Sequence, residues 1–168
     1  MDKTEMTKYF AYRVSATDRW GYAFYDTDKN RIGSVSFVVD KYSAAHIESK
    51  DLNWHSSFSI DSEIVPGTGR RVTDHLTGNE VYRLVFWKPG LYQVRSATDC
   101  VQVEIRGDEY LFGAPQELVT AMTKRIDTAD WIPSELPGAK PVLKTTVFED
   151  VSEAYLMMVL SFPALRFY

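Results

Sequence analysis

The most apolar stretch of this 168-residue chain reads Ala154-Tyr-Leu-Met-Met-Val-Leu-Ser-Phe-Pro163 and lies close to the C-terminus. Five consecutive apolar residues, Leu156 to Leu160, point in every direction around a helix with about 3.6 residues per turn. Such a helix has no side left for water. We therefore expect the rest of the chain to surround it.

The residues before this stretch predict where the helix begins. Asp150 is a residue type that caps helices, and Glu153 is placed to reach back to the backbone amide of Asp150, as in a capping box. We expect a helix of about eleven residues starting at Val151, about 16 Å long, with Pro163 closing the apolar run. That length fits inside a large β-barrel but would leave apolar surface exposed against a single sheet. A barrel closed around the helix is the economical arrangement.

The preceding chain has the composition of strands. Aromatic and β-branched residues alternate with polar ones, and turn residues such as Asp26, Asn30 and the Gly78-Asn79 pair separate these segments. Short strands at this spacing favour a mainly β sandwich or barrel over a wound α/β sheet. The expected strands are residues 9–15, 20–26, 32–39, 81–87, 91–95 and 101–106, with a further strand before the Gly78-Asn79 turn.

Two later segments are harder to assign. Residues 116–126 fit a helix opened by Pro115, yet residues 119–126 also alternate as a strand, which is the interpretation we adopt. Residues 130–141 carry three prolines and a glycine and predict a loop over the surface. Because too little chain follows that loop for a second core, residues 1–168 are expected to form a single domain.

Composition narrows the classes of function. Nineteen basic and twenty-three acidic side chains give a net charge of −4, so a nucleic-acid partner is disfavoured. Cys100 is the only cysteine, which excludes an intrachain disulfide and fits a reducing compartment. The polar N-terminus lacks the apolar core of a signal peptide, and no run is long enough for a transmembrane segment. We expect a cytoplasmic protein.

No motif for catalysis, metal binding or a cofactor is evident. Residues 26–37 resemble the start of a calcium loop, but Arg31 and Phe37 occupy the positions that need glycine and glutamate. The histidines His46, His55 and His75 lack metal-ligand spacing. A triad built on Asp74-His75 would need a positioned nucleophile, and no Gly-x-Ser-x-Gly elbow is present. We expect a protein that is not an enzyme and holds no cofactor or metal.

Two basic pairs are candidate anion ligands. The segment Pro66-Gly-Thr-Gly-Arg-Arg71 could fold its amides into an anion-binding concavity flanked by Arg70 and Arg71, although a plain solvated turn is the alternative. Lys124 and Arg125 form the second pair. If they belong to a strand, their side chains lie on opposite faces of the sheet.

The turn hairpins at residues 26–32 and 74–81, the segment 119–125 and the closing apolar helix together resemble the tubby C-terminal superfamily. The resemblance covers most of the chain, is closest to the small LURP-one-related members, and extends more distantly to phospholipid scramblases. It implies an antiparallel closed β-barrel of about twelve strands threaded by the last helix.

For function, the resemblance implies binding of anionic phospholipid or phosphoinositide headgroups by basic side chains on the barrel surface. This chain has no clear counterpart of the superfamily's basic motif. The candidate headgroup ligands are therefore its own pairs, Arg70, Arg71, Lys124 and Arg125. Two alternatives stay open: a barrel that binds a small hydrophobic ligand or carries an unrecognised hydrolytic site, and a protein-interaction scaffold.

Overall fold

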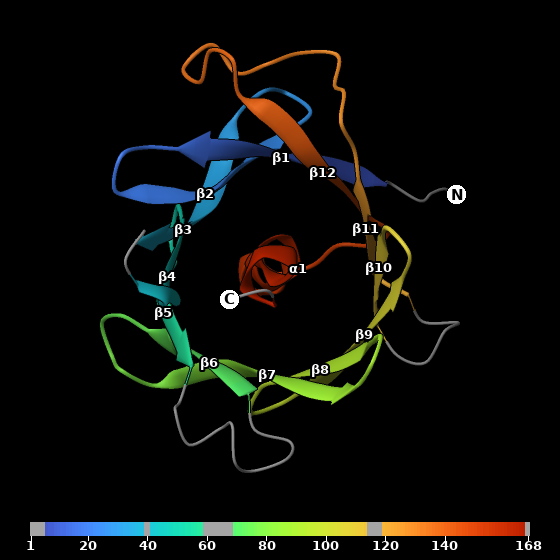
Figure 1. Ribbon diagram of the computed structural model, residues 1–168. Coiled ribbons are helices and arrows are strands. Elements are labelled where there is room, and N and C mark those ends of the chain that lie inside the picture. The colour runs from blue at the N-terminus through green and yellow to red at the C-terminus, as the bar shows by residue number, and fades with distance from the viewer. Residues whose placement is uncertain (1–5, 39–40, 59–68, 114–118, 167–168) are drawn as a thin grey trace.

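The C-terminal helix α1 (Glu153–Leu165) runs through the middle of a closed barrel of strands (Figure 1). This computed structural model describes residues 6–38, 41–58, 69–113 and 119–166. Every residue from Met157 to Leu165 is buried, so the prediction that no side of the helix faces water is confirmed for this part. Val151, Tyr155 and Leu156 lie nearer the barrel opening and are only half-buried.

Within the described residues, twelve antiparallel strands form the barrel, and each strand pairs with its neighbours in the sequence. Because β1 also pairs with β12, the sheet has no free edge. The predicted fold, an antiparallel barrel closed around the C-terminal helix, is confirmed. The strands are β1 (Thr7–Ser15), β2 (Arg19–Asp26), β3 (Arg31–Val38), β4 (Lys41–Ser49), β5 (Asn53–Phe58), β6 (Gly69–Asp74), β7 (Glu80–Lys88), β8 (Leu91–Arg95), β9 (Cys100–Arg106), β10 (Glu109–Phe112), β11 (Ala121–Arg125) and β12 (Lys140–Val147).

The helix and the inner face of the barrel form one core. Phe162 is fully buried and meets three rings edge-on, with centroid distances of 5.5 Å to Tyr92, 6.1 Å to Tyr110 and 5.6 Å to Phe112. Edge-to-face contacts at these distances are favourable beyond the area they bury. They connect the helix to two strands, β8 through Tyr92 and β10 through Tyr110 and Phe112.

The start of the helix differs from the prediction. Ser152 is the N-cap in place of Asp150, and its Oγ accepts a hydrogen bond from the Tyr155 amide at 3.1 Å. Glu153 does not close a capping box, because its carboxylate accepts hydrogen bonds from the Ser49 hydroxyl and the Asp51 amide. The bond from Ser49 is the main cause of the lowered pKa of Glu153. The helix start is thereby tied to the turn between β4 and β5.

The end of the helix also differs, since Pro163 lies inside α1 and the helix continues to Leu165. Proline lacks the N–H that would bond the carbonyl four residues earlier, which normally kinks or ends a helix. Here the residues on both sides of Pro163 are buried in the barrel, and the Arg166 amide still donates to the Phe162 carbonyl at 3.0 Å. Burial on every side outweighs the missing bond.

A second, smaller core lies outside the barrel. The loop between β11 and β12 folds over the outer faces of β1 and β2, where Tyr12 and Tyr25 are fully buried. Trp131 of this loop lies against both rings, and its carbonyl accepts a hydrogen bond from the Tyr12 hydroxyl at 2.8 Å. The predicted surface loop is confirmed up to Lys140, where β12 begins, and it seals part of the barrel wall.

The strand predictions were right for β1, β2, β3, β6, β7, β8 and β9, and β11 confirms the strand interpretation of residues 121–125. Val39 and residues 116–118 lie outside the described residues. The turn at Asp26 is also confirmed, because its Oδ1 accepts hydrogen bonds from the Asp28 and Asn30 amides, both at 2.9 Å. In the other turn Gly78 takes a positive φ of 76°. Strands β4, β5, β10 and β12 were not predicted.

The central position of Phe162 gives a stability prediction. Phe162→Ala should lower the free energy of unfolding by about 3–5 kcal/mol, because it leaves a cavity between the helix and three aromatic rings. Urea denaturation followed by circular dichroism measures the change. As a control, Leu76→Ala removes a side chain that is 87% exposed and should stay within about 0.5 kcal/mol of the wild type. Equal losses in the two variants would contradict a core organised around the helix.

Candidate functional site

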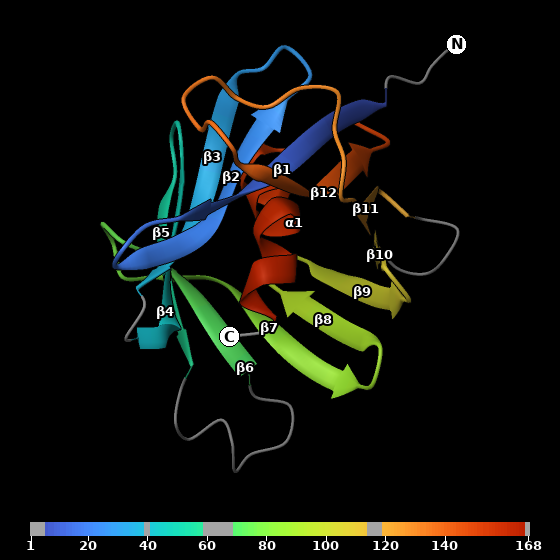
Figure 2. The same ribbon diagram turned by 45° about the horizontal axis from the view of Figure 1, so that its top comes forward.

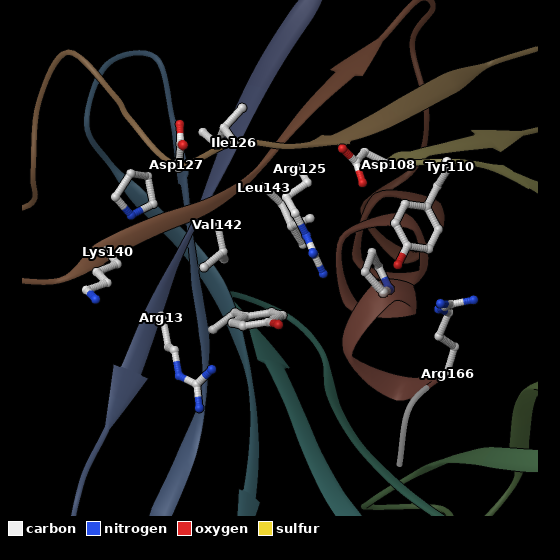
Figure 3. A pocket seen from close by; sticks show the side chains of 14 residues that line it. Arg13, Asp108, Tyr110, Arg125, Ile126, Asp127, Lys140, Val142, Leu143 and Arg166 are labelled. Atoms are coloured by element: carbon white, nitrogen blue, oxygen red, sulfur yellow. The ribbon is translucent and has the colours of Figure 1, made fainter.

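A hollow of about 480 Å³ lies at the barrel end where α1 stops. We call it the basic pocket, because four cationic side chains, Arg13, Arg125, Lys140 and Arg166, contribute to its lining. In the view of Figure 3, Arg125 lies between Arg13 on one side and Arg166 on the other, and Lys140 lies at the edge. Hollows of this size are typical of sites for small molecules or molecular headgroups.

The strand order explains why these residues meet. In an antiparallel barrel whose strands follow one another in sequence, odd-numbered strands end and even-numbered strands begin at the same end. Arg13 lies near the end of β1, Arg125 is the last residue of β11 and Lys140 is the first of β12. The pairing of Arg13 with Lys140 brings two positive charges side by side. Residues more than one hundred positions apart therefore share one hollow.

The alternation of side chains explains why Arg13 and Arg125 turn toward the barrel opening. Arg13 follows Ala11 at an interval of two, and Ala11 belongs to the core around the helix. Arg125 follows Ala121 and Thr123 in the same way, and both of these are buried. At the ends of their strands these two positions pass beyond the apolar core, so their charged groups reach solvent inside the rim.

Arg166 is the first residue after α1 and closes the pocket from the helix side. Its guanidinium carbon lies 5.4 Å from the centroid of the Tyr110 ring, and its side chain also hydrogen-bonds the Tyr110 hydroxyl. Burial raises the pKa of Tyr110, and the nearby positive charges of Arg166 and Arg125 act in the opposite direction. Tyr110 therefore keeps its proton at neutral pH and can act as a hydrogen-bond donor in the pocket.

The charges of the pocket favour an anion. Its lining also holds two carboxylates, Asp108 and Asp127, and the helix C-terminus adds about half a negative charge. The four positive charges therefore outweigh the combined negative charge of the two carboxylates and the helix end. In the described part of the chain, no ion pair with a carboxylate neutralises Arg13, Arg125 or Lys140. Guanidinium groups bind planar oxyanions and phosphates through paired N–H donors, so the arrangement suits a phosphorylated or carboxylated ligand.

Of the four residues named from the sequence, only Arg125 lies in this pocket. Arg70 was expected on the barrel surface, but its side chain points inward and is 2% exposed. It donates a hydrogen bond to the Ser56 Oγ at 2.9 Å and lies 5.8 Å from the centroid of Phe37. Burial lowers its pKa to about 10, so it stays charged at neutral pH. Arg70 is thus part of the core and is not accessible to a headgroup.

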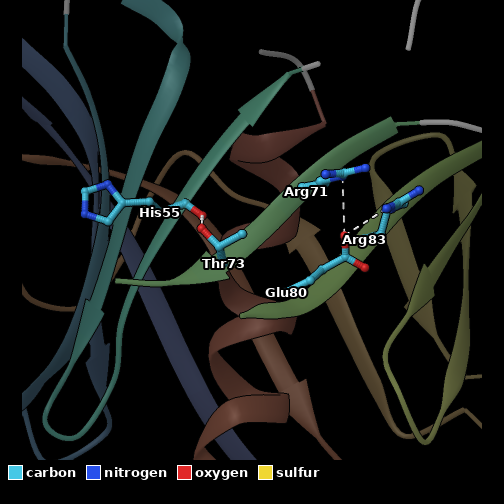
Figure 4. Close-up of polar contacts among 5 residues, drawn as sticks. All are labelled: His55, Arg71, Thr73, Glu80 and Arg83. Carbon is cyan, nitrogen blue, oxygen red and sulfur yellow. Dashed lines mark hydrogen bonds and ion pairs between the residues drawn. The ribbon is translucent and has the colours of Figure 1, made fainter. Parts of the chain in front are cut away.

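Arg71 and Lys124 are exposed but lie on the outside of the wall, on strands far apart around the barrel. Arg71 lies 3.4 Å from the Glu80 carboxylate, which also binds Arg83 at 2.9 Å (Figure 4). Lys124 pairs across strands with Glu109 and Lys144. The expected shared phosphate patch of Arg70, Arg71, Lys124 and Arg125 is therefore not formed. Residues 66–68 of the suggested concavity lie outside the described residues.

The sequence interpretation missed Arg13, Lys140 and Arg166. Arg13 does occupy the inward position of a predicted strand, so its alternation with Tyr9 and Ala11 was a usable signal. Lys140 lay in a predicted loop, and Arg166 follows a proline that was expected to close the apolar run. Their meeting depends on the register of β1 with β12, which no local pattern contains.

The three histidines, scattered in the sequence, form a column on the outside of the barrel. The rings of His46 and His55 stack at 4.8 Å between centroids, and those of His55 and His75 lie 4.4 Å apart. The strand pairing of His46 with His55 and the hydrogen bond from the His75 amide to the Asn53 carbonyl produce this alignment. The His46 and His55 rings are stacked and the His75 ring is tilted by 40° from that of His55; no metal-binding group of histidine, cysteine or carboxylate residues occurs among the described residues.

Comparison with known proteins yields no relative: no family model, no curated protein and no solved structure matches this chain. Among the residues that the structure describes, no helix has the length and hydropathy needed to cross a membrane.

The histidine column predicts a pH dependence of stability. Burial, followed by the neighbouring His46 and His75, lowers the pKa of His55, so the unfolded chain takes up this proton at a higher pH than the folded chain. Stability should therefore decline as the pH falls below the unfolded value of about 6.5.

We expect His55→Asn to lose less thermal stability than the wild type when the pH is lowered from about 8 to about 5.5. Differential scanning fluorimetry across this range measures the midpoints. The comparison at the higher pH isolates any structural effect of the substitution itself. Parallel declines in both proteins would show that the column does not govern the pH response.

Proposed function

We propose that this protein is a non-enzymatic module of the tubby-like type that binds anionic phospholipid headgroups in the basic pocket. The observation that carries the proposal is the convergence of Arg13, Arg125, Lys140 and Arg166 around one hollow. Phosphate oxygens match the paired donors of guanidinium groups, and a phosphoinositide headgroup offers several phosphates to separate cations. The barrel threaded by its last helix is also the architecture that the resemblance implies.

Several features favour binding over catalysis. The Tyr110 hydroxyl has a raised pKa caused mainly by burial, which makes it a poor nucleophile and a suitable hydrogen-bond donor. The arginines of the pocket stay positively charged at neutral pH, so they donate hydrogen bonds to an anion but do not transfer protons. We also place the protein in the cytoplasm, because Cys100 is an exposed free thiol of the kind that persists in a reducing compartment.

Binding of a small hydrophobic ligand is the second candidate function, favoured by another hollow of about 670 Å³ beside the start of α1. Ile32, Val151, Leu156 and Met157 contribute apolar surface to its lining. Organic extraction of the purified protein followed by mass spectrometry should release a co-purified ligand. Leu156→Arg, which places a charge in this hollow, should purify without it. An empty wild-type extract would count against this function.

The neighbouring residues Arg125 and Lys124 allow a matched test of the first function. Arg125→Gln should weaken binding of soluble inositol trisphosphate by about tenfold or more, because it removes charge-assisted hydrogen bonds in the pocket. Isothermal titration calorimetry measures the affinity. Lys124→Gln removes the same charge from the same strand, but on the outer face, and should bind like the wild type.

Co-sedimentation provides the lipid arm of this test. Vesicles of phosphatidylcholine with phosphatidylinositol bisphosphate should retain the wild type, and vesicles of phosphatidylcholine alone should not. Headgroup binding in the basic pocket would be refuted by equal retention on both vesicles, or by an Arg125→Gln variant as tight as the wild type.

A further inference from the structure

The hairpin between β7 and β8 ends in two aromatic side chains that the barrel does not cover. Phe86 is 51% exposed and Trp87 is 56% exposed. The strand register jumps at this point, since Phe86 pairs with Tyr92 and Lys88 with Leu91, which leaves Trp87 without a partner on β8. A β-bulge of this kind redirects a side chain, here outward at the rim of the barrel.

Apart from an edge-on contact of Phe86 with Tyr92 at 5.4 Å between ring centroids, these two exposed side chains lie outside the buried core. Of the six large hydrophobic residues that are exposed in the described part of the chain, Val38, Phe86 and Trp87 lie at the ends of odd-numbered strands. Leu76 lies in the turn after β6, at the opposite end of the barrel. Neighbouring exposed apolar side chains of this type commonly mark a surface that contacts a partner or a membrane.

The same barrel end carries the basic pocket. Figure 2 shows the β7–β8 hairpin and the final turn of α1 on the same, lower side of the barrel. A hydrogen bond of 2.8 Å from the Ile105 amide to the Gly90 carbonyl joins this hairpin to β9. Two residues further along, Gly107 and Asp108 line the pocket. The aromatic tip and the cations thus lie on the rim of the same barrel end, on opposite sides of its opening, since β7 and β8 lie across the barrel from β1 and β12 (Figure 1).

Exposed aromatic rings together with cations fit the surface of an anionic lipid bilayer. Tryptophan and phenylalanine favour the interfacial layer of a bilayer, where a ring enters the acyl boundary while nearby polar groups stay hydrated. Lys88, next to Trp87, can keep its ammonium group among lipid phosphates while its stem lies on apolar surface. The cations of the pocket are attracted to the negative potential of an anionic leaflet. A protein partner would satisfy the rings but would not explain why the cations lie at the same end of the barrel as the rings.

We propose that this rim docks on an anionic membrane surface, with Phe86 and Trp87 entering the interfacial layer while the basic pocket binds a lipid headgroup. The proposal rests on the proposed function and adds the orientation of the barrel: the end with the helix C-terminus faces the membrane. The turn between β6 and β7 then faces away from it.

Vesicle partitioning tests the orientation. Phe86→Ser combined with Trp87→Ser should lower partitioning onto phosphatidylcholine vesicles containing phosphatidylinositol bisphosphate by about tenfold or more, because apolar contact with the interface is lost. Both side chains are largely exposed, so the variant should fold normally, which thermal unfolding checks. Leu76→Ser is the matched control, since it removes an exposed apolar side chain from the far end and should partition like the wild type.

Depth-dependent quenching provides a second readout. Brominated phosphatidylcholine in these vesicles should quench the tryptophan fluorescence of the wild type but not that of Trp87→Phe. The readout is the difference between the two proteins, because Trp20, half-buried at the start of β2, lies at the same barrel end and can contribute some quenching to both.

The outcomes separate this proposal from the function on which it rests. The Phe86 and Trp87 variants should bind soluble inositol trisphosphate as tightly as the wild type. If the wild type itself does not bind this soluble headgroup, the proposed function is refuted. If the wild type binds the soluble headgroup, docking through the rim is overturned by equal partitioning of the wild type and the double serine variant. Quenching as strong in Trp87→Phe as in the wild type would overturn it as well.

Discussion

The structure depends on the need to enclose a helix that has no polar face. Nine consecutive residues of α1 are buried, so a single sheet or a partner helix would leave part of its surface in water. A closed antiparallel barrel satisfies this need on all sides and also leaves no strand edge unpaired. Local details serve the same contact. At Gly33, for example, an added Cβ would lie 2.6 Å from the Glu48 carbonyl oxygen and 2.7 Å from the Met157 Cε.

Filling the barrel with a helix moves the available sites to its ends. At the end where the helix begins, Glu153 is tied to Ser49 and Asp51, and apolar residues border a hollow. At the other end the helix stops while the strands carry arginine and lysine past the core, which creates a charged hollow. The two ends thus differ in chemistry for a structural reason, and the charged end is the one with exposed aromatic rings on its rim.

Basic residues next to each other in a strand point their side chains to opposite faces of the sheet and therefore lie in different environments. Arg70 is buried against Ser56 and Phe37, whereas Arg71 pairs with Glu80 on the outside. Arg125 enters the basic pocket, whereas Lys124 faces outward. A charged side chain inside the barrel is compatible with folding where partners offset its burial, and Arg70 has a hydrogen bond to Ser56 and the ring of Phe37. Pairs of basic residues in a strand therefore cannot be treated as one binding unit.

The sequence by itself determined that the chain must be strand-rich and must wrap around residues 156–162, because hydrophobic patterning and turn chemistry are local properties. It also indicated that Lys124 and Arg125 would separate if their segment were a strand. Only the tertiary structure decided that Arg13, Arg125, Lys140 and Arg166 would meet, because their meeting depends on the register of β1 against β12 and on where the helix ends. The burial of Arg70 and the alignment of the three histidines were decided in the same way. Register and closure arise from packing between distant segments, and no short stretch of sequence encodes them.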